Sequence, residues 1–164
     1  LIKHGITLKK VLTGGTGSAS LTLDMPEEAP GRYEASSTNV VAIAGLNASL
    51  KGLDIDDHRE TVRELTEYLL EALNNIPSVN LMGAFDTDKT LGIVSFVVEG
   101  YESDEIGTIL DDEYDIAVRT GYHCAPYIHD YLGDKPYHGT IRIGIGQFNT
   151  KEDIDALISA IESL

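Results

Sequence analysis

An amphipathic pattern between residues 54 and 76 constrains the fold more than any other feature of this sequence. Acidic residues at 54–57 suit the positive N-terminal end of a helix, and Pro77 ends it. A helix with one apolar face must bury that face against a second layer of structure, so we expect a layered domain. The apolar residues recur at three- and four-residue spacing, as on one face of a helix: they are Val62, Leu65, Leu69, Ala72, Leu73 and Ile76.

Four segments carry the pattern of β-strands. Residues 79–82 and 92–98 are rich in Val, Ile, Leu and Phe, and a polar turn at 86–89 joins them, which predicts a hairpin. We expect two further strands at residues 115–119 and 140–146 because apolar residues dominate the first and alternate along the second.

Helical patterns surround these strands and fix the fold class. We expect the order helix, helix, strand, strand, helix, strand, strand, helix, which predicts an α+β domain with a small, mostly antiparallel sheet covered by helices. Residues 1–38 are predicted to be an irregular linking segment with a Gly-rich loop, and residues 39–164 a small domain. The expected helices lie at residues 40–50, at 103–113, at 127–132 before a polar loop at 133–139, and after a capping box of Thr150 and Asp153.

The charge balance excludes two classes of partner. The 164 residues include 12 Lys and Arg against 27 Asp and Glu, a formal net charge of −15. No basic patch can then neutralise a row of phosphates, so we expect neither nucleic acid nor an anionic membrane as a partner. A single cysteine excludes a disulfide framework and a Cys-rich zinc site, and it fits a cytoplasmic location.

That cysteine, Cys124, lies in the segment 118–126 (VRTGYHCAP) with His123 beside it and Arg119 five residues earlier. Nearby positive charge or a base favours the reactive thiolate. Gly121 permits a turn, so we expect an exposed loop that follows a strand. The alternative is a small buried apolar residue, since free cysteine is among the most buried residue types.

Two other features are candidates for ligand binding. Residues 13–18 (TGGTGS) bring backbone N–H groups and hydroxyls into one loop, but they lack the Lys-Ser/Thr pair of a phosphate loop, and a plain turn is the alternative. Arg142 is either a ligand-binding residue or an ordinary solvated one. The period of two along its strand places it on the opposite face from Ile141, Ile143 and Ile145.

Four motifs in one order resemble the C-terminal portion of the cysteine desulfurases, the pyridoxal-phosphate (PLP) enzymes of the class V aminotransferase superfamily. The resemblance covers nearly the whole chain and implies the small C-terminal domain of a fold-type I PLP enzyme. It also implies a homodimer in the full-length protein and sulfur delivery to an acceptor protein, as in iron–sulfur cluster assembly. The motifs are GGTGS at 14–18, RYEASSTN at 32–39, AVRTGYHCAP at 117–126, and Arg142 followed by FNT at 148–150.

The resemblance implies a role for each matching residue of the second half. Cys124 matches the nucleophile that accepts sulfur from L-cysteine as a persulfide while L-alanine is released. Arg142 matches the arginine that binds the substrate's α-carboxylate, a task suited to a planar fork of two donors. Arg119 is implied to support the loop and the substrate, and His123 is a further substrate-binding candidate.

The resemblance also implies contacts to the cofactor. Gly15 and Thr16 match a loop that borders the active site of the opposite subunit in such dimers. Ser37 stands where relatives usually carry a threonine that reaches the cofactor phosphate. Here Ser-Ser-Thr-Asn replaces the commoner Gly-Thr-x-Asn, and a serine hydroxyl can still supply that contact.

One essential part of the family lies outside this chain. The lysine that holds PLP as a Schiff base belongs to the larger N-terminal domain, and no lysine here lies in a matching motif. A start at Leu1 rather than Met agrees with a piece of a longer protein. We therefore expect the chain alone to be inactive.

The sequence leaves three alternatives open: selenocysteine lyase, another class V enzyme, and a docking module. Selenocysteine lyase and other class V enzymes share the scaffold, and a partner-docking module without chemistry would retain the fold and use its acidic surface. Metal binding by His123, Cys124 and His129 is not expected, because their spacing is unlike that of zinc ligands.

Overall fold

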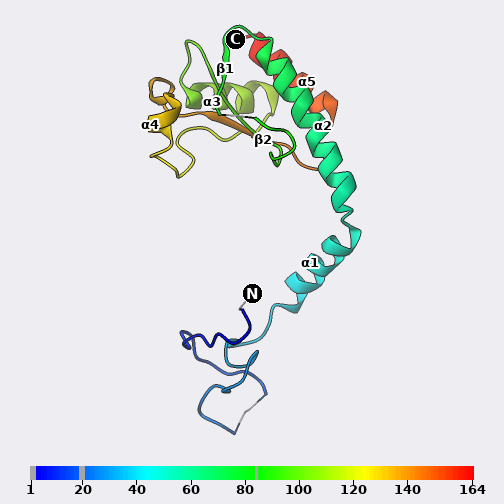
Figure 1. Cartoon of the computed structure of the whole chain (residues 1–164), viewed down its shortest axis with the longest axis vertical. Helices are drawn as coiled ribbons and strands as arrows, with labels where there is room; N and C mark the ends of the chain where they lie inside the picture. The colour runs from blue at the N-terminus through cyan, green and yellow to red at the C-terminus, as the bar shows by residue number, and fades with distance from the viewer. Residues whose placement is uncertain (1–2, 19–20, 84) are drawn as a thin grey trace. The chain divides into compact units, whose positions relative to one another are not determined.

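The computed structural model describes residues 3–18, 21–83 and 85–164. The chain divides into two compact units, Leu1–Leu53 and Asp54–Leu164. The domain boundary expected between residues 38 and 39 stays a prediction. Each unit is built by its own contacts, and Figure 1 shows their elements.

Polar contacts organise the irregular part of the first unit. The Tyr33 hydroxyl lies 3.0 Å from the N–H and 3.4 Å from the carbonyl oxygen of Leu8. Glu27 pairs with Lys10 at 2.6 Å and also with Arg32, and these two cations lower the pKa of its carboxyl group. Among the described residues of this unit, Met25 alone belongs to the buried hydrophobic set.

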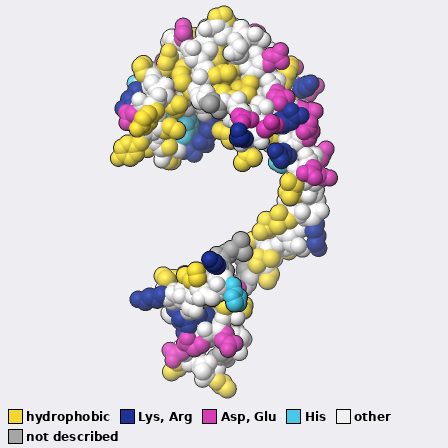
Figure 2. Space-filling model, in the orientation of Figure 1, with side chains coloured by type: hydrophobic (Ala, Val, Ile, Leu, Met, Phe, Trp, Pro, Cys, Tyr) yellow, Lys and Arg dark blue, Asp and Glu magenta, His cyan; other side chains and the backbone are white. Residues whose placement is uncertain are grey.

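Helix α1 (Val40–Gly52) ends the first unit and confirms the helix expected at 40–50. The Asn39 side chain accepts a hydrogen bond from the Ala42 N–H at 3.0 Å, which caps the first turn. None of its residues is buried, and Figure 2 shows hydrophobic side chains on its surface. The helix is therefore stabilised locally rather than by a core of its own unit.

Helix α2 (Ile55–Asn74) opens the second unit and confirms the amphipathic pattern. The Asp54 side chain accepts hydrogen bonds from the N–H groups of Asp56 and Asp57, as the acidic cluster predicted. Its apolar stripe is buried, with Leu69 and Leu73 fully inaccessible to solvent.

Three antiparallel strands form the sheet found in the described residues. They are β1 (Val79–Leu81), β2 (Ile93–Val98) and β3 (Ile141–Gly144), in the order β1-β2-β3. In the register, Phe96 lies opposite Ile141 and also opposite Leu81. The predicted hairpin is thus confirmed, and one face of the sheet is apolar across all three strands.

Helices α3 (Ser103–Tyr114) and α5 (Lys151–Glu162) join α2 in the layer that covers the sheet. α5 starts at the predicted capping box, because Thr150 and Asp153 exchange side-chain and backbone hydrogen bonds. Figure 1 shows α5 alongside α2. The layers share one core, which includes Leu65, Leu69, Leu73, Val94, Phe96, Val98, Ile106, Leu110, Ile141, Ile154, Leu157 and Ile161. The α+β class with a small antiparallel sheet is confirmed.

The strand predicted at residues 115–119 is wrong. Asp115 adopts a left-handed conformation at the end of α3, and the Ile116 N–H bonds back to the Leu110 carbonyl. This cap holds the start of the segment to the helix, so within the segment only Arg119 pairs with β3, where it forms an isolated bridge with Arg142.

The segment between Arg119 and β3 differs from the prediction in two places. The helix expected at 127–132 is the shorter α4 (His129–Leu132). The expected polar loop at 133–139 contains the 3-10 helix η1 (Lys135–Tyr137). No helix among the described residues is long and apolar enough to cross a membrane.

Replacing Leu69 by Ala should destabilise the second unit strongly. Its side chain is fully buried between α2 and the sheet, so truncation leaves a cavity and should cost about 2–5 kcal/mol in the free energy of unfolding, measured by urea titration. The matched control is Leu91→Ala, a leucine that is 83% exposed, which should change it by less than about 0.5 kcal/mol. Equal losses in the two variants would contradict the assignment of the core.

Candidate functional site

The cysteine loop, residues 118–126, is exposed at its tip. Cys124 is exposed, so the alternative of a buried cysteine is wrong. Gly121 has a φ of +84°, in agreement with the predicted turn. His123 and Cys124 follow with φ values of +50° and +60°, a conformation that non-glycine residues rarely adopt. The loop therefore holds its thiol in a strained turn at the surface.

Arg119 connects this turn to the sheet. Its backbone N–H and carbonyl pair with those of Arg142, at N···O distances of 3.2 and 2.7 Å. Its side chain reaches back to the loop, where Nη2 donates to the Sγ of Cys124 at 3.3 Å. This contact places a positive charge next to the sulfur, the kind of neighbour found at reactive cysteines.

Arg142 lies on β3 with its side chain on the face away from the three covering helices. Ile141 and Ile145 are in the core, and Ser95 lies opposite Arg142 in the register, so the predicted orientation is confirmed. Within the described part of the chain, its guanidinium makes no hydrogen bond or ion pair. Its five donors are thus available to an anionic ligand.

His123 faces the start of β3. Its Nε2 lies 2.8 Å from the Thr140 hydroxyl and 3.1 Å from the Thr140 carbonyl oxygen. Burial, and then the positive charge of Arg142, lower the pKa of His123 below its usual value. A neutral ring can donate from Nε2 to Thr140. Its Nδ1 then carries a lone pair, and among the described residues that atom is buried without a partner.

A close backbone crossing holds the cysteine loop against the segment that enters β3. The Thr140 N–H donates to the Gly121 carbonyl at 3.2 Å. Gly139 has a φ of +100°, and a Cβ there would lie 2.4 Å from the Gly121 carbonyl carbon, so no side chain fits. The Ser103 hydroxyl fixes the same loop to α3, because it accepts from the Gly121 N–H at 3.3 Å.

Sequence reasoning missed a buried pair next to this loop. His129, weighed only as a metal ligand, is 2% exposed and pairs with Asp134, which is fully buried. Their spacing of five residues matches no established motif, so the sequence carried no signal for the pair. The described residues contain no cluster of three metal-binding side chains.

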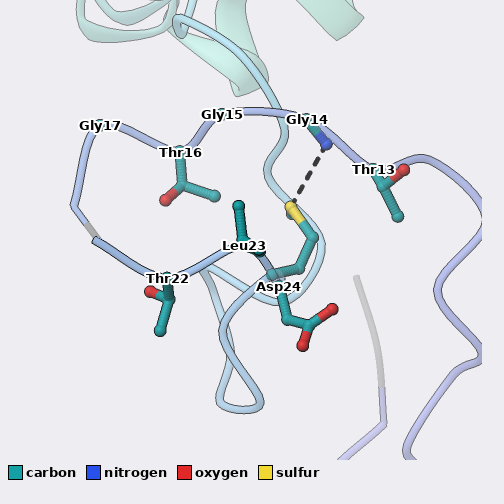
Figure 3. Close-up of a pocket in the computed structure, with 9 residues that line it drawn as sticks. Thr13, Gly14, Gly15, Thr16, Gly17, Thr22, Leu23 and Asp24 are labelled. Carbon is teal, nitrogen blue, oxygen red and sulfur yellow. Dashed lines mark hydrogen bonds between the residues drawn. The ribbon is translucent and has the colours of Figure 1, made fainter. Parts of the chain in front are cut away.

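Gly15, Thr16 and Ser37 lie in the first unit. The Ser36 N–H donates to the Gly15 carbonyl at 2.7 Å, so the Gly-rich loop and the segment with Ser37 lie side by side. Ser37 is exposed, and within the described residues its hydroxyl makes no hydrogen bond. In Figure 3 the Gly-rich loop borders a hollow, and the Gly14 N–H is directed at the sulfur of Met25. The volume of this hollow is about 530 Å³.

These groups fit a phosphate in part. The backbone N–H groups of a glycine-rich turn and the hydroxyls of Thr16 and Ser37 are suitable donors. Asp24 also lines the hollow, and its carboxylate opposes an anion there. The exposed Ser37 hydroxyl is therefore a better candidate for a phosphate contact than the interior of the hollow.

Residues 3–157 match the model of the family described as aminotransferase class-V. Among curated proteins, a cysteine desulfurase of Escherichia coli O1:K1 / APEC is 30% identical over 158 residues, and the match covers 92% of this chain and 37% of the relative. The chain thus spans little more than a third of the length of such relatives.

Solved structures give the same picture. The apo cysteine desulfurase from Thermococcus onnurineus NA1 is similar with a TM-score of 0.80 and 28% identity, over 93% of this chain and 38% of that one. The cysteine desulfurase CsdA (S-sulfonic acid) from Escherichia coli is similar with a TM-score of 0.75 and 28% identity, over 94% and 38%.

Replacing His123 by Gln should reduce the pH dependence of the free energy of unfolding at acidic pH. Because the folded pKa of His123 lies below the unfolded value of about 6.5, the unfolded chain binds a proton that the folded chain does not. The contribution of His123 to stability is therefore complete above about pH 6.5 and decreases as the pH drops towards the folded pKa, by less than about 1.4 kcal/mol per pH unit because water screens the partly exposed ring. Urea titrations at about pH 7.5 and 5.5 measure the difference.

The matched control for this prediction is His4→Gln, at an exposed histidine of the first unit. We expect this control to keep the pH dependence of the unchanged chain, whereas His123→Gln loses part of it. The same pH dependence in all three proteins would show that protonation of His123 does not destabilise the folded state.

Proposed function

The chain belongs to the aminotransferase class-V family, and on that premise we propose that it is the C-terminal part of a PLP-dependent cysteine desulfurase. One observation carries the proposal: an exposed cysteine thiol with an arginine Nη2 at 3.3 Å, next to a second arginine whose guanidinium makes no hydrogen bond or ion pair among the described residues. A sulfur-accepting nucleophile and an anchor for a carboxylate are the two groups that this reaction needs from a chain of this kind.

Cys124 acts as the sulfur acceptor in this proposal. Its thiolate attacks the sulfur of L-cysteine, so that a bond forms between the two sulfur atoms while the substrate's Cβ–S bond breaks. The bonding electrons stay with the carbon skeleton, which takes up a proton and leaves as L-alanine. Arg119 supports the negative charge on Cys124 before the attack.

Arg142 binds the α-carboxylate of L-cysteine. The side chain lies on the open face of β3, and its backbone is bonded to that of Arg119, so the carboxylate anchor and the thiol share one support. A planar guanidinium can hold both oxygens of a carboxylate in one orientation. His123 has a lowered pKa and lies next to Cys124 in the chain and near Arg142. It is a further group that can contact the substrate.

PLP, when bound, supplies an electron sink for the substrate's carbon skeleton. From this chain, the hydroxyls of Ser37 and Thr16 and the backbone N–H groups of Gly15 and Thr16 would contact its phosphate. The lysine that attaches the cofactor lies outside this chain, so we expect the chain alone to release no alanine. A homodimer and a sulfur-acceptor protein, to which the exposed Cys124 passes its sulfur, complete the proposal.

Replacing Cys124 by Ala in the full-length protein that carries this chain should abolish alanine release from L-cysteine, with a loss of at least about 100-fold in kcat. Cys124→Ser is the matched control for side-chain volume, and it should lose as much because its hydroxyl is a far weaker nucleophile. Full activity of the alanine variant would overturn the role of Cys124. A preference for selenocysteine over cysteine in the same assay would favour selenocysteine lyase instead.

Replacing Arg142 by Gln should raise the KM for L-cysteine about 10- to 100-fold, since a charge-assisted hydrogen bond is worth about 1.5–3 kcal/mol. Arg63→Gln is the matched control, at an arginine of α2 that pairs with Glu60 and Glu67 instead of facing the site. Unchanged KM in the Arg142 variant would contradict its role as carboxylate anchor.

A further inference from the structure

A buried pair of ionisable side chains next to the cysteine loop takes no part in the proposed chemistry. His129 is 2% exposed and Asp134 is fully buried. The Nδ1 of His129 lies 2.6 Å from Oδ2 of Asp134, and its Nε2 lies 3.0 Å from the carbonyl oxygen of Tyr122. One imidazole thus links a carboxylate after α4 to a carbonyl two residues before Cys124.

The two contacts of His129 define how many protons the pair holds. A backbone carbonyl only accepts, so Nε2 must carry a hydrogen. The contact between Nδ1 and the carboxylate needs a second hydrogen, which we place on Nδ1 because an imidazole nitrogen is ordinarily the stronger base. The pair therefore holds one proton more than a neutral imidazole beside a carboxylate, and it corresponds to an imidazolium paired with a carboxylate.

The other groups nearby leave His129 as the partner of the Asp134 carboxylate. Oδ1 of Asp134 is buried and has no hydrogen-bond partner in the described part of the chain, so His129 is the group that compensates the carboxylate. The neighbouring Lys135 is engaged by Asp130 at the surface. The ring of His123, 6.1 Å away between centroids, has a lowered pKa and adds no charge near neutral pH. Removing either member of such a buried pair leaves the other uncompensated.

The Tyr122 carbonyl is the point where the pair acts on the thiol. This carbonyl also accepts from the Ala125 N–H at 2.9 Å, which closes a β-turn around His123 and Cys124. Positive φ at both central residues is the pattern of a type I′ turn, which favours Asn-Gly rather than His-Cys. The ring of His129 also meets the edge of the Tyr122 ring at 5.0 Å and 77°. The buried imidazole therefore fixes the residue on which the strained turn depends.

We propose that His129, held protonated by Asp134, is a positioning residue that keeps Cys124 in this turn and its sulfur beside Arg119. The inference rests on the proposed function for its effect on sulfur transfer. The geometry of the thiol itself can be tested without that function, because Cys124 is the single cysteine of the chain.

Three variants distinguish the effect of protonating His129 from the effect of its two hydrogen bonds. Asp134→Asn lets an amide N–H donate to Nδ1, so a neutral His129 keeps both contacts. Asp134→Ala removes one partner and strands the imidazole. His129→Phe keeps a ring but removes both hydrogen bonds. Leu69→Ala is the control, since it destabilises the core without touching the loop.

Two readouts on the chain test the proposal near pH 7. The ¹⁵N chemical shifts of His129 should show both nitrogens protonated in the unchanged chain, and an unprotonated Nδ1 in Asp134→Asn. The rate constant for alkylation of Cys124 by iodoacetamide should fall about three- to tenfold in His129→Phe and Asp134→Ala, because the thiol leaves Arg119. It should stay within about twofold in Asp134→Asn and Leu69→Ala.

Three results would overturn the proposal: one unprotonated nitrogen on His129 in the unchanged chain, alkylation of His129→Phe at the original rate, or a loss in Asp134→Asn as large as in Asp134→Ala. If the two disruptive variants do not fold, the ¹⁵N shifts and Asp134→Asn still decide. In the full-length protein, Asp134→Ala should lower kcat for alanine release and leave the KM for L-cysteine within about twofold. Failure of the unchanged full-length protein to release alanine would refute the proposed function alone, since both thiol readouts are independent of it.

Discussion

Two backbone hydrogen bonds between Arg119 and Arg142 determine where the groups of the second unit's site lie. They attach the start of the cysteine loop to β3, whose register with β2 is fixed in turn by the apolar residues under α2, α3 and α5. A slip of β3 by one residue would turn Arg142 into the core and its neighbouring isoleucines outwards. The same slip would move Arg119 away from Cys124. The hydrophobic core therefore sets the distance between the Cys124 thiol and the Arg142 guanidinium, although neither group belongs to the core.

The backbone of the cysteine loop is locally strained. Two successive non-glycine residues with positive φ cost about 1–3 kcal/mol each, and they persist only where the surroundings over-determine them. Here the surroundings are polar: the Ser103 hydroxyl, the Thr140 N–H and the imidazole of His129 each hold a backbone group of the loop. A loop fixed by hydrogen bonds to three different segments can remain exposed and still present its thiol in one orientation.

The sequence predicted the parts of this arrangement that depend on periodicity and on local signals. The stripe of α2, the hairpin, the caps at Asp54 and Thr150 and the face of Arg142 all follow from the spacing of apolar residues and short polar motifs. The strand at 115–119 was predicted wrongly because its Ile and Val suit a strand, whereas the C-cap of α3 directs Ile116 back to the helix. The pair of His129 and Asp134 could not be predicted, because its meaning depends on burial and on a carbonyl that only the fold brings close.

The exposure of Cys124 decides which of its contacts matter most. An ion pair at a solvated surface contributes little, commonly below about 1 kcal/mol, so the Arg119 guanidinium alone is a weak means of activating the thiol. Orientation is not screened by water in this way, and misplacing a reacting atom by about 1 Å is enough to slow a reaction 100-fold. In the proposed function this thiol both takes up sulfur in a site and passes it on at the surface, so burial would strengthen the charge interaction but block the second step. Control of the backbone by a buried imidazole, with the sulfur left exposed, satisfies both requirements.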